Sequence, residues 1–63
     1  MKRYILTAYY EKYPTRERTL ANFIVTNPVV TIDGIYATSK TAWGGEVRNF
    51  YPNHNIVSIK EDN

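Results

Sequence analysis

The chain has 63 residues, with eight basic and six acidic side chains, one His and no Cys. A chain this short forms one domain and buries only about 60% of the surface that its unfolded form exposes, so its stability depends on packing or on a partner. The lack of Cys excludes disulfides, thiolate metal sites and a Cys nucleophile, and it favours a reducing, cytoplasmic location. No apolar run approaches the roughly 20 residues that span a bilayer, so we expect no membrane partner.

The charge is uneven along the chain. The first 18 residues carry five basic and two acidic side chains, a net +3, and the remainder carries −1. This basic end is weaker than the dense basic stripe of a duplex-DNA binder. The six Tyr, two Phe and one Trp exceed what a core of this size can seal, so some aromatic residues should lie in an interface.

Residues 2–13 predict a first strand, because they are rich in aromatic and β-branched residues and lack Gly and Pro. Alternation separates two faces. The more apolar face, which we assign to the core, comprises Tyr4, Leu6, Ala8 and Tyr10. The other face, expected to be exposed, comprises Arg3, Ile5, Thr7, Tyr9, Glu11 and Tyr13.

The polar segment 14–18 predicts a turn, and residues 19–27 predict a second strand that Asn27-Pro28 interrupts. Asp33-Gly34 lies between two apolar β-branched runs, which is a strong hairpin signal because both turn positions favour positive φ. Residues 29–32 and 35–37 should therefore form two short strands, the alternative being one long bulged strand.

The segment "KTAWGGEVRNFYP" admits a helix or a ligand-presenting loop. Ser39 is a suitable N-cap, Ala42, Trp43, Val47 and Phe50 lie near one helical stripe, and Pro52 would end the helix. Gly44 and Gly45 weaken such a helix by about 1 kcal/mol each, but residues without Cβ allow it to approach a sheet closely. We therefore predict a helix over 39–51 whose Trp43, Val47 and Phe50 face the sheet.

The last segments are a turn over 52–55, a short strand over 56–60 and a mobile tail over 61–63. The expected fold is α+β: a small antiparallel sheet of three to five strands with one helix packed on one face, in the order β-β-(β-hairpin)-α-β. Residues 1–63 should form a single compact domain. The expected core comprises Tyr4, Leu6, Phe23, Val25, Trp43, Val47, Phe50 and Ile59.

No catalytic, metal-binding or cofactor-binding pattern is present in the sequence. The single His, His54, falls in a predicted surface turn without metal-ligand partners. Glu61 and Asp62 are adjacent but lie in the expected tail, where acid–base geometry cannot be fixed. The Gly44-Gly45 pair matches no phosphate-binding loop. We expect a protein that is not an enzyme and holds no metal or cofactor.

The exposed face of the first strand and the turn after it combine aromatic and basic residues. Single-stranded nucleic-acid platforms use this combination, and so do the hot spots of protein interfaces. Unpaired strands at a sheet edge would also permit strand addition or a homodimer. The sequence leaves these alternatives open, together with a plain solvated face.

The segment "IYATSKTAWGGEVRNFYPNHNIVSIKE", residues 35–60 in the main, resembles the second half of very small phage-encoded β-β-α-β proteins, such as the phage T7 inhibitor of bacterial RNA polymerase. The resemblance implies an early phage protein that binds a host enzyme in the host cytoplasm. Basic contact positions of that family correspond to Ser58 and Lys60, of which only Lys60 keeps the charge. The family's acidic strip has no counterpart.

The leading hypothesis is a phage or mobile-element protein that binds a host protein and inhibits it by occlusion. One alternative is a nucleic-acid binder of low specificity, and another is a self-associating structural component. The residues expected to bind the partner are Arg3, Tyr9, Tyr13, Arg16, Arg18 and Lys60.

Overall fold

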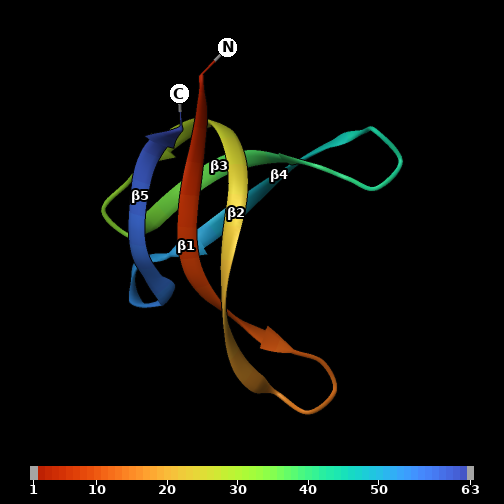
Figure 1. Cartoon of the computed structure of the whole chain (residues 1–63). Coiled ribbons are helices and arrows are strands. Elements are labelled where there is room, and N and C mark those ends of the chain that lie inside the picture. Colours follow the sequence, from red (N-terminus) through yellow and green to blue (C-terminus); the bar gives the residue numbers. More distant parts are fainter. Residues whose placement is uncertain (1, 63) are drawn as a thin grey trace.

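The computed structural model describes residues 2–62 and consists almost entirely of β-structure (Figure 1). The strands are β1 (Arg3–Lys12), β2 (Glu17–Val30), β3 (Gly34–Lys40), β4 (Glu46–Pro52) and β5 (Ile56–Asp62). A one-turn 3-10 helix, η1 (Asn53–Asn55), connects β4 to β5, and residues 2–62 contain no α-helix. The predicted α+β class is therefore wrong, and the fold is all-β.

The five strands form one antiparallel sheet in the order β4-β3-β2-β1-β5. Four strands follow one another as a meander, and β5 returns to pair with β1. The sheet curls, so that β3 and β4 cross behind β1, β2 and β5 (Figure 1). The long β2 contributes to both parts of the curled sheet. It bends at a register shift between Thr26 and Val29, where Asn27 has a φ of 50°. Bulges of this kind turn the corners of curled sheets.

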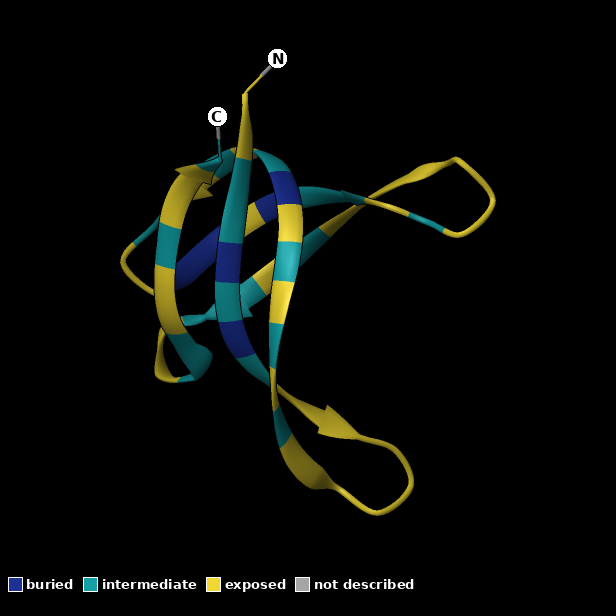
Figure 2. Cartoon of the chain, in the orientation of Figure 1, coloured by how far each residue is buried: buried dark blue, intermediate teal, exposed yellow. Residues whose placement is uncertain are grey.

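The core lies where the two layers of the curled sheet face each other (Figure 2). It consists of Leu6, Ala8, Val25, Ile35 and Ala37, all of which are buried. These residues alternate along β1, β2 and β3 as one face of a pleated strand requires. Five further side chains pack partly buried around them: Tyr4, Phe23, Tyr51, Ile56 and Ile59.

The turn between β2 and β3 contains Asp33 of the predicted pair, while Gly34 begins β3, and Thr31 closes the turn. The Thr31 backbone N–H donates to the Gly34 carbonyl at 2.7 Å, and the Thr31 Oγ1 accepts from the Gly34 N–H at 3.2 Å. Gly34 has no positive φ. A Cβ there would overlap the Tyr51 carbonyl oxygen and lie 2.9 Å from Pro52 Cα. Gly34 is therefore needed for the close approach of β3 to β4. The expectation that it adopts a positive φ in the turn is wrong.

The predicted helix over 39–51 is wrong. Ser39 and Lys40 end β3, residues 41–45 form a turn, and Glu46 begins β4. Gly44 has a φ of 82°, the left-handed region that glycine adopts without steric cost. Two glycines oppose a helix but suit a hairpin turn, and seven register pairs between β3 and β4 replace the helical hydrogen bonds.

Three of the predicted core residues belonged to that helix, and all three are exposed. Trp43 is 93% exposed, while Val47 and Phe50 are each 42% exposed. The other predicted core residues are either fully buried, as Leu6 and Val25 are, or packed against the core. Trp43 and Val47 are exposed because they lie where the β3–β4 hairpin extends past the body, and Phe50 is exposed because it lies on the outer face of the sheet beside Tyr36.

The expected tail is also corrected, because β5 extends through Asp62. Lys2 Nζ lies 3.3 Å from Glu61 Oε1, and Arg3 Nη2 lies 3.4 Å from Asp62 Oδ2. These ion pairs join the first and last strands, although exposed pairs of this kind contribute at most about 1 kcal/mol. Asn63 lies outside the described residues. None of the residues 2–62 belongs to a helix long and apolar enough to cross a membrane.

Candidate protein-binding surfaces

The β3–β4 tip, defined here as residues 41–45, presents Trp43 to solvent at the end of a hairpin that projects from the body (Figure 1). Three hydrogen bonds order it. The Thr41 N–H donates to the Gly45 carbonyl at 2.9 Å, and the Gly44 N–H donates to the Thr41 carbonyl at 3.1 Å. The Gly45 N–H donates to Thr41 Oγ1 at 3.1 Å. The tip is therefore an ordered turn that carries the only Trp of the chain.

Tyr9 and Arg18, two predicted partner-binding residues, lie against each other on the outer face of β1 and β2. The Arg18 guanidinium carbon lies 4.3 Å from the centre of the Tyr9 ring. Its Nη2 also donates to the His54 carbonyl at 3.1 Å and to Asn55 Oδ1 at 3.3 Å. Arg18 thus connects the β1–β2 hairpin to η1. These contacts of the Nη2 group and of the guanidinium face give Arg18 a structural role that the sequence did not indicate.

The remaining predicted partner-binding residues fall into two groups. Arg3 and Lys60 lie on the same outer face as Tyr9, in register with Asp62 and Ile5 respectively. Tyr13 and Arg16 lie in the turn between β1 and β2, far along a second projecting hairpin (Figure 1). Tyr13 is 91% exposed. The six residues therefore do not form one continuous surface.

A second aromatic surface lies on the outer face of β3 and β4. Val29, Tyr36 and Phe50 are register partners across β2, β3 and β4, and all three are exposed. The Tyr36 and Phe50 ring centres are 4.8 Å apart at 47°. Arg48 lies in the next row, where its Nη1 donates to Thr38 Oγ1 at 2.8 Å. Sequence reasoning missed this row because Phe50 and Arg48 had been placed on a helix. Strand alternation of residues 46–52 was the signal that could have found it.

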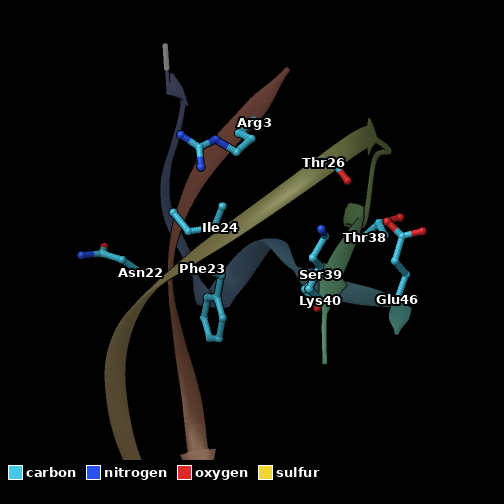
Figure 3. Close-up of a pocket in the computed structure, with 9 residues that line it drawn as sticks. All are labelled: Arg3, Asn22, Phe23, Ile24, Thr26, Thr38, Ser39, Lys40 and Glu46. Atoms are coloured by element: carbon cyan, nitrogen blue, oxygen red, sulfur yellow. The ribbon is translucent and has the colours of Figure 1, made fainter. Parts of the chain in front are cut away.

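A half-open groove of about 770 Å³ separates β2 from the end of β3 (Figure 3). One wall is formed by residues 22–24 and 26 of β2, with Arg3 at one end. The other wall is formed by Thr38, Ser39 and Lys40 of β3 and by Glu46 of β4. Its volume is within the range of ligand sites, about 300–1,000 Å³, but its walls are strand edges.

The described residues offer no group of side chains that could hold a metal ion. Within residues 2–62, no three His, Asp or Glu side chains gather as metal ligands would. His54 is exposed in η1, and its backbone carbonyl accepts from Arg18. That the protein is not an enzyme and needs no cofactor stays a prediction.

Comparison of the chain with protein-family models, with curated proteins and with solved structures gives no match. The resemblance to small phage-encoded proteins therefore stays a prediction. The resemblance included a helix over residues 39–51, and these residues form a β-hairpin instead. The proposed function therefore rests on the exposed surfaces described above.

Proposed function

We propose that this protein binds another protein and that Trp43, at the β3–β4 tip, is the anchor that enters a pocket of the partner. The observation that carries the proposal is the combination of nearly complete exposure with an ordered turn. Trp43 is 93% exposed, yet three hydrogen bonds hold the turn that presents it. A Trp so exposed adds little packing to the fold.

The energetics of such an anchor are favourable. A Trp that becomes buried in a partner removes about 150–250 Å² from water, worth about 4–6 kcal/mol before the costs of association. Because the turn is already hydrogen-bonded, little backbone entropy is lost on binding. Trp is also among the residue types most enriched in interface hot spots.

The second projecting hairpin supports the same mode of action. Arg16 has a φ of 59°, a conformation that costs a residue with a Cβ about 1–2 kcal/mol. Glycine would be favoured there for stability alone. A basic residue at this position is therefore consistent with contact to a partner, as is the exposed Tyr13 beside it. With two protruding tips, the protein would act by occluding a site on its target.

The experiment compares the wild type with Trp43→Ala in capture from a bacterial lysate, using Ile32→Ala as the matched control. Ile32 is 92% exposed at the β2–β3 turn and so tests loss of an exposed apolar side chain elsewhere. We expect one or more proteins to be retained by the wild type and by Ile32→Ala but lost with Trp43→Ala. Equal retention by Trp43→Ala would contradict the proposal.

Fluorescence of Trp43 provides the direct measurement. When the captured protein is purified and added, emission should shift to shorter wavelength, because the ring leaves water. The same shift with lipid vesicles and not with the protein would instead identify a membrane surface as the partner.

A second candidate function is supported by the exposed Tyr36–Phe50 pair with Arg48 in the adjacent row. Exposed aromatic side chains on which bases can stack, together with a nearby cation, bind single-stranded nucleic acid without sequence preference. In that case affinity for an oligonucleotide should fall steeply with salt and should be lost in Tyr36→Ala. Binding that needs Trp43 but not Tyr36 favours the protein partner.

A further inference from the structure

The first half of β2 has one unpaired edge. β1 pairs with β2 from Glu17 to Thr26, whereas β3 pairs with it only from Thr26 to Val30. In an antiparallel strand, alternate residues direct their backbone N–H and C=O groups to opposite sides. Every second residue between Glu17 and Val25 therefore directs these groups away from β1, where no strand lies. Among residues 2–62, no turn or loop backbone hydrogen bond involves this stretch.

The space beside this edge is open. The groove of about 770 Å³ runs along Asn22, Phe23 and Ile24, and its opposite wall is the end of β3 (Figure 3). From Ser39 onward β3 no longer pairs with β2, so the two strands diverge. An extended chain can therefore lie against β2 with a wall on its other side.

The free edges of the sheet differ in their side chains; besides β4, β5 and the first half of β2, they include Tyr9–Lys12 of β1, which pair with β2 alone. The outer edge strand β4 carries Glu46, Arg48 and Pro52, and the outer edge strand β5 ends in Lys60-Glu61-Asp62. Charges and Pro are the features that protect natural edge strands from pairing. The open edge of β2 begins with the charged Glu17 and Arg18, but the stretch that leads to the groove, "TLANFIV" (residues 19–25), has no charge and no Pro. These seven residues beside the groove are therefore the part of the β2 edge that remains competent to pair.

We propose that this edge of β2 accepts an extended, uncharged polypeptide segment of a partner protein as an added strand. The added strand would alternate its side chains between Phe23, on the core side, and Ile24, on the outer face, so β-branched and apolar residues fit it. The groove shows no charge preference: Arg3 is paired with Asp62, and Lys40 is in register with Glu46. Two copies of the chain do not fit together through their β2 edges, because in each copy this edge is recessed beside the end of β3. This site is separate from Trp43 and goes beyond the function proposed above.

The test uses a synthetic peptide of alternating Thr and Val with a Lys at each end, about seven residues long to match the open edge at about 3.3 Å per residue. Binding is followed by amide chemical shifts and by hydrogen exchange of the full-length protein. A control peptide carries N-methyl groups on alternate residues of its β2-facing side, which removes backbone donors and keeps the side chains. In the free protein, alternate amides between 19 and 25 should exchange fast while their neighbours, bonded to β1, exchange slowly.

Addition of the unmodified peptide should slow the fast amides, and the N-methylated peptide should bind at least tenfold more weakly. Ile24→Lys should weaken binding by a similar factor, because a charge protects the edge. Val57→Lys is the matched control: Val57 is 56% exposed on β5 and Ile24 is 51% exposed, so both tolerate the substitution. Trp43→Ala should leave binding unchanged, which separates this site from the Trp43 anchor.

Several outcomes would overturn the inference. One is equal binding of the N-methylated peptide, and another is protection at β4 or β5 in place of β2. A third is no detectable binding below a Kd of about 1 mM, the weakest association such a titration resolves. Sedimentation that shows a dimer in which the β2 amides are already protected would identify a second copy as the occupant.

Discussion

The body of the sheet and the β3–β4 tip are held by different forces. In the body, Leu6 and Val25 are fully buried and pack with Ala8, Ile35 and Ala37 from neighbouring strands. At the tip, Trp43 contacts little, and order comes from hydrogen bonds around Thr41. Residues that stabilise the fold and residues available to a partner are therefore largely different residues. Substitutions should separate the two effects.

The largest effect is expected in the body. Leu6→Ala removes most of a fully buried side chain and leaves a cavity, so the free energy of unfolding should fall by about 2–5 kcal/mol. In a domain this small, such a loss approaches the total stability. Urea denaturation followed by circular dichroism measures it. Leu20→Ala is the control, since Leu20 is exposed on β2; an equal loss there would mean that the core has been misplaced.

The next effect tests close approach between β3 and β4. Gly34→Ala places a Cβ against the Tyr51 carbonyl, which belongs to the backbone and cannot rotate away. We expect a loss of about 1–3 kcal/mol, the usual cost of overpacking. In Gly45→Ala at the tip, the new Cβ meets only Thr41 Oγ1, at 3.3 Å, so the loss should be smaller. Thermal denaturation of both variants gives the comparison, and a reversed order would contradict it.

A moderate effect is expected where a hairpin meets η1. Arg18→Ala removes the contact with the Tyr9 ring and the hydrogen bonds to His54 and Asn55. Because the site is exposed, the loss should be about 1 kcal/mol. Faster hydrogen exchange at residues 53–55 would locate the change. Arg48→Ala, which removes a single hydrogen bond to Thr38, is the matched control and should leave η1 unchanged.

The smallest effect on stability is expected at the tip. Trp43→Ala should change the free energy of unfolding by no more than about 0.5 kcal/mol, the usual range for an exposed position. Native Trp43 should emit at the wavelength of a water-exposed indole and change little on unfolding. The sequence-based expectation was a blue-shifted emission. Observing a blue shift would mean that Trp43 is buried against the sheet and not exposed at the tip.

Part of the fold followed from local pattern. Alternation in residues 3–12 identifies β1 and its inward face, and Leu6 and Ala8 on that face are buried. The Asp33-Gly34 signal placed the β2–β3 turn to within one residue, since the turn comprises residues 31–33 and Gly34 begins β3. The predicted break at Asn27-Pro28 is wrong, because β2 continues through a register shift there to Val30. The helix was inferred from apolar spacing in a segment where Val47, Phe50 and Tyr51 are residues that favour strands equally well. Four apolar residues spread over 13 positions could not distinguish the helical period of about 3.6 residues from the strand period of 2.

The candidate site was predictable only in part. Tyr13 was expected to be exposed as part of the outer face of the first strand and Arg16 as part of the turn. Both are exposed, and both lie in the turn between β1 and β2. The pairing of Arg18 with η1 joins residues 36 and 37 positions apart, which no local pattern reveals. The Tyr36–Phe50 row and the open edge of β2 likewise depend on which strands pair and over what length.

By itself, the sequence determined that the protein is small, lacks Cys and has more aromatic residues than its core can bury. It also located β1, the first turn and, to within one residue, the turn at Asp33. Tertiary structure alone decided the state of residues 39–52. Gly44 adopts a left-handed turn there because β4 gains a full ladder of hydrogen bonds with β3. That pairing carries Trp43 beyond the body, where no second layer can cover it. The exposure of the only Trp is thus a consequence of strand pairing, which local propensity does not contain.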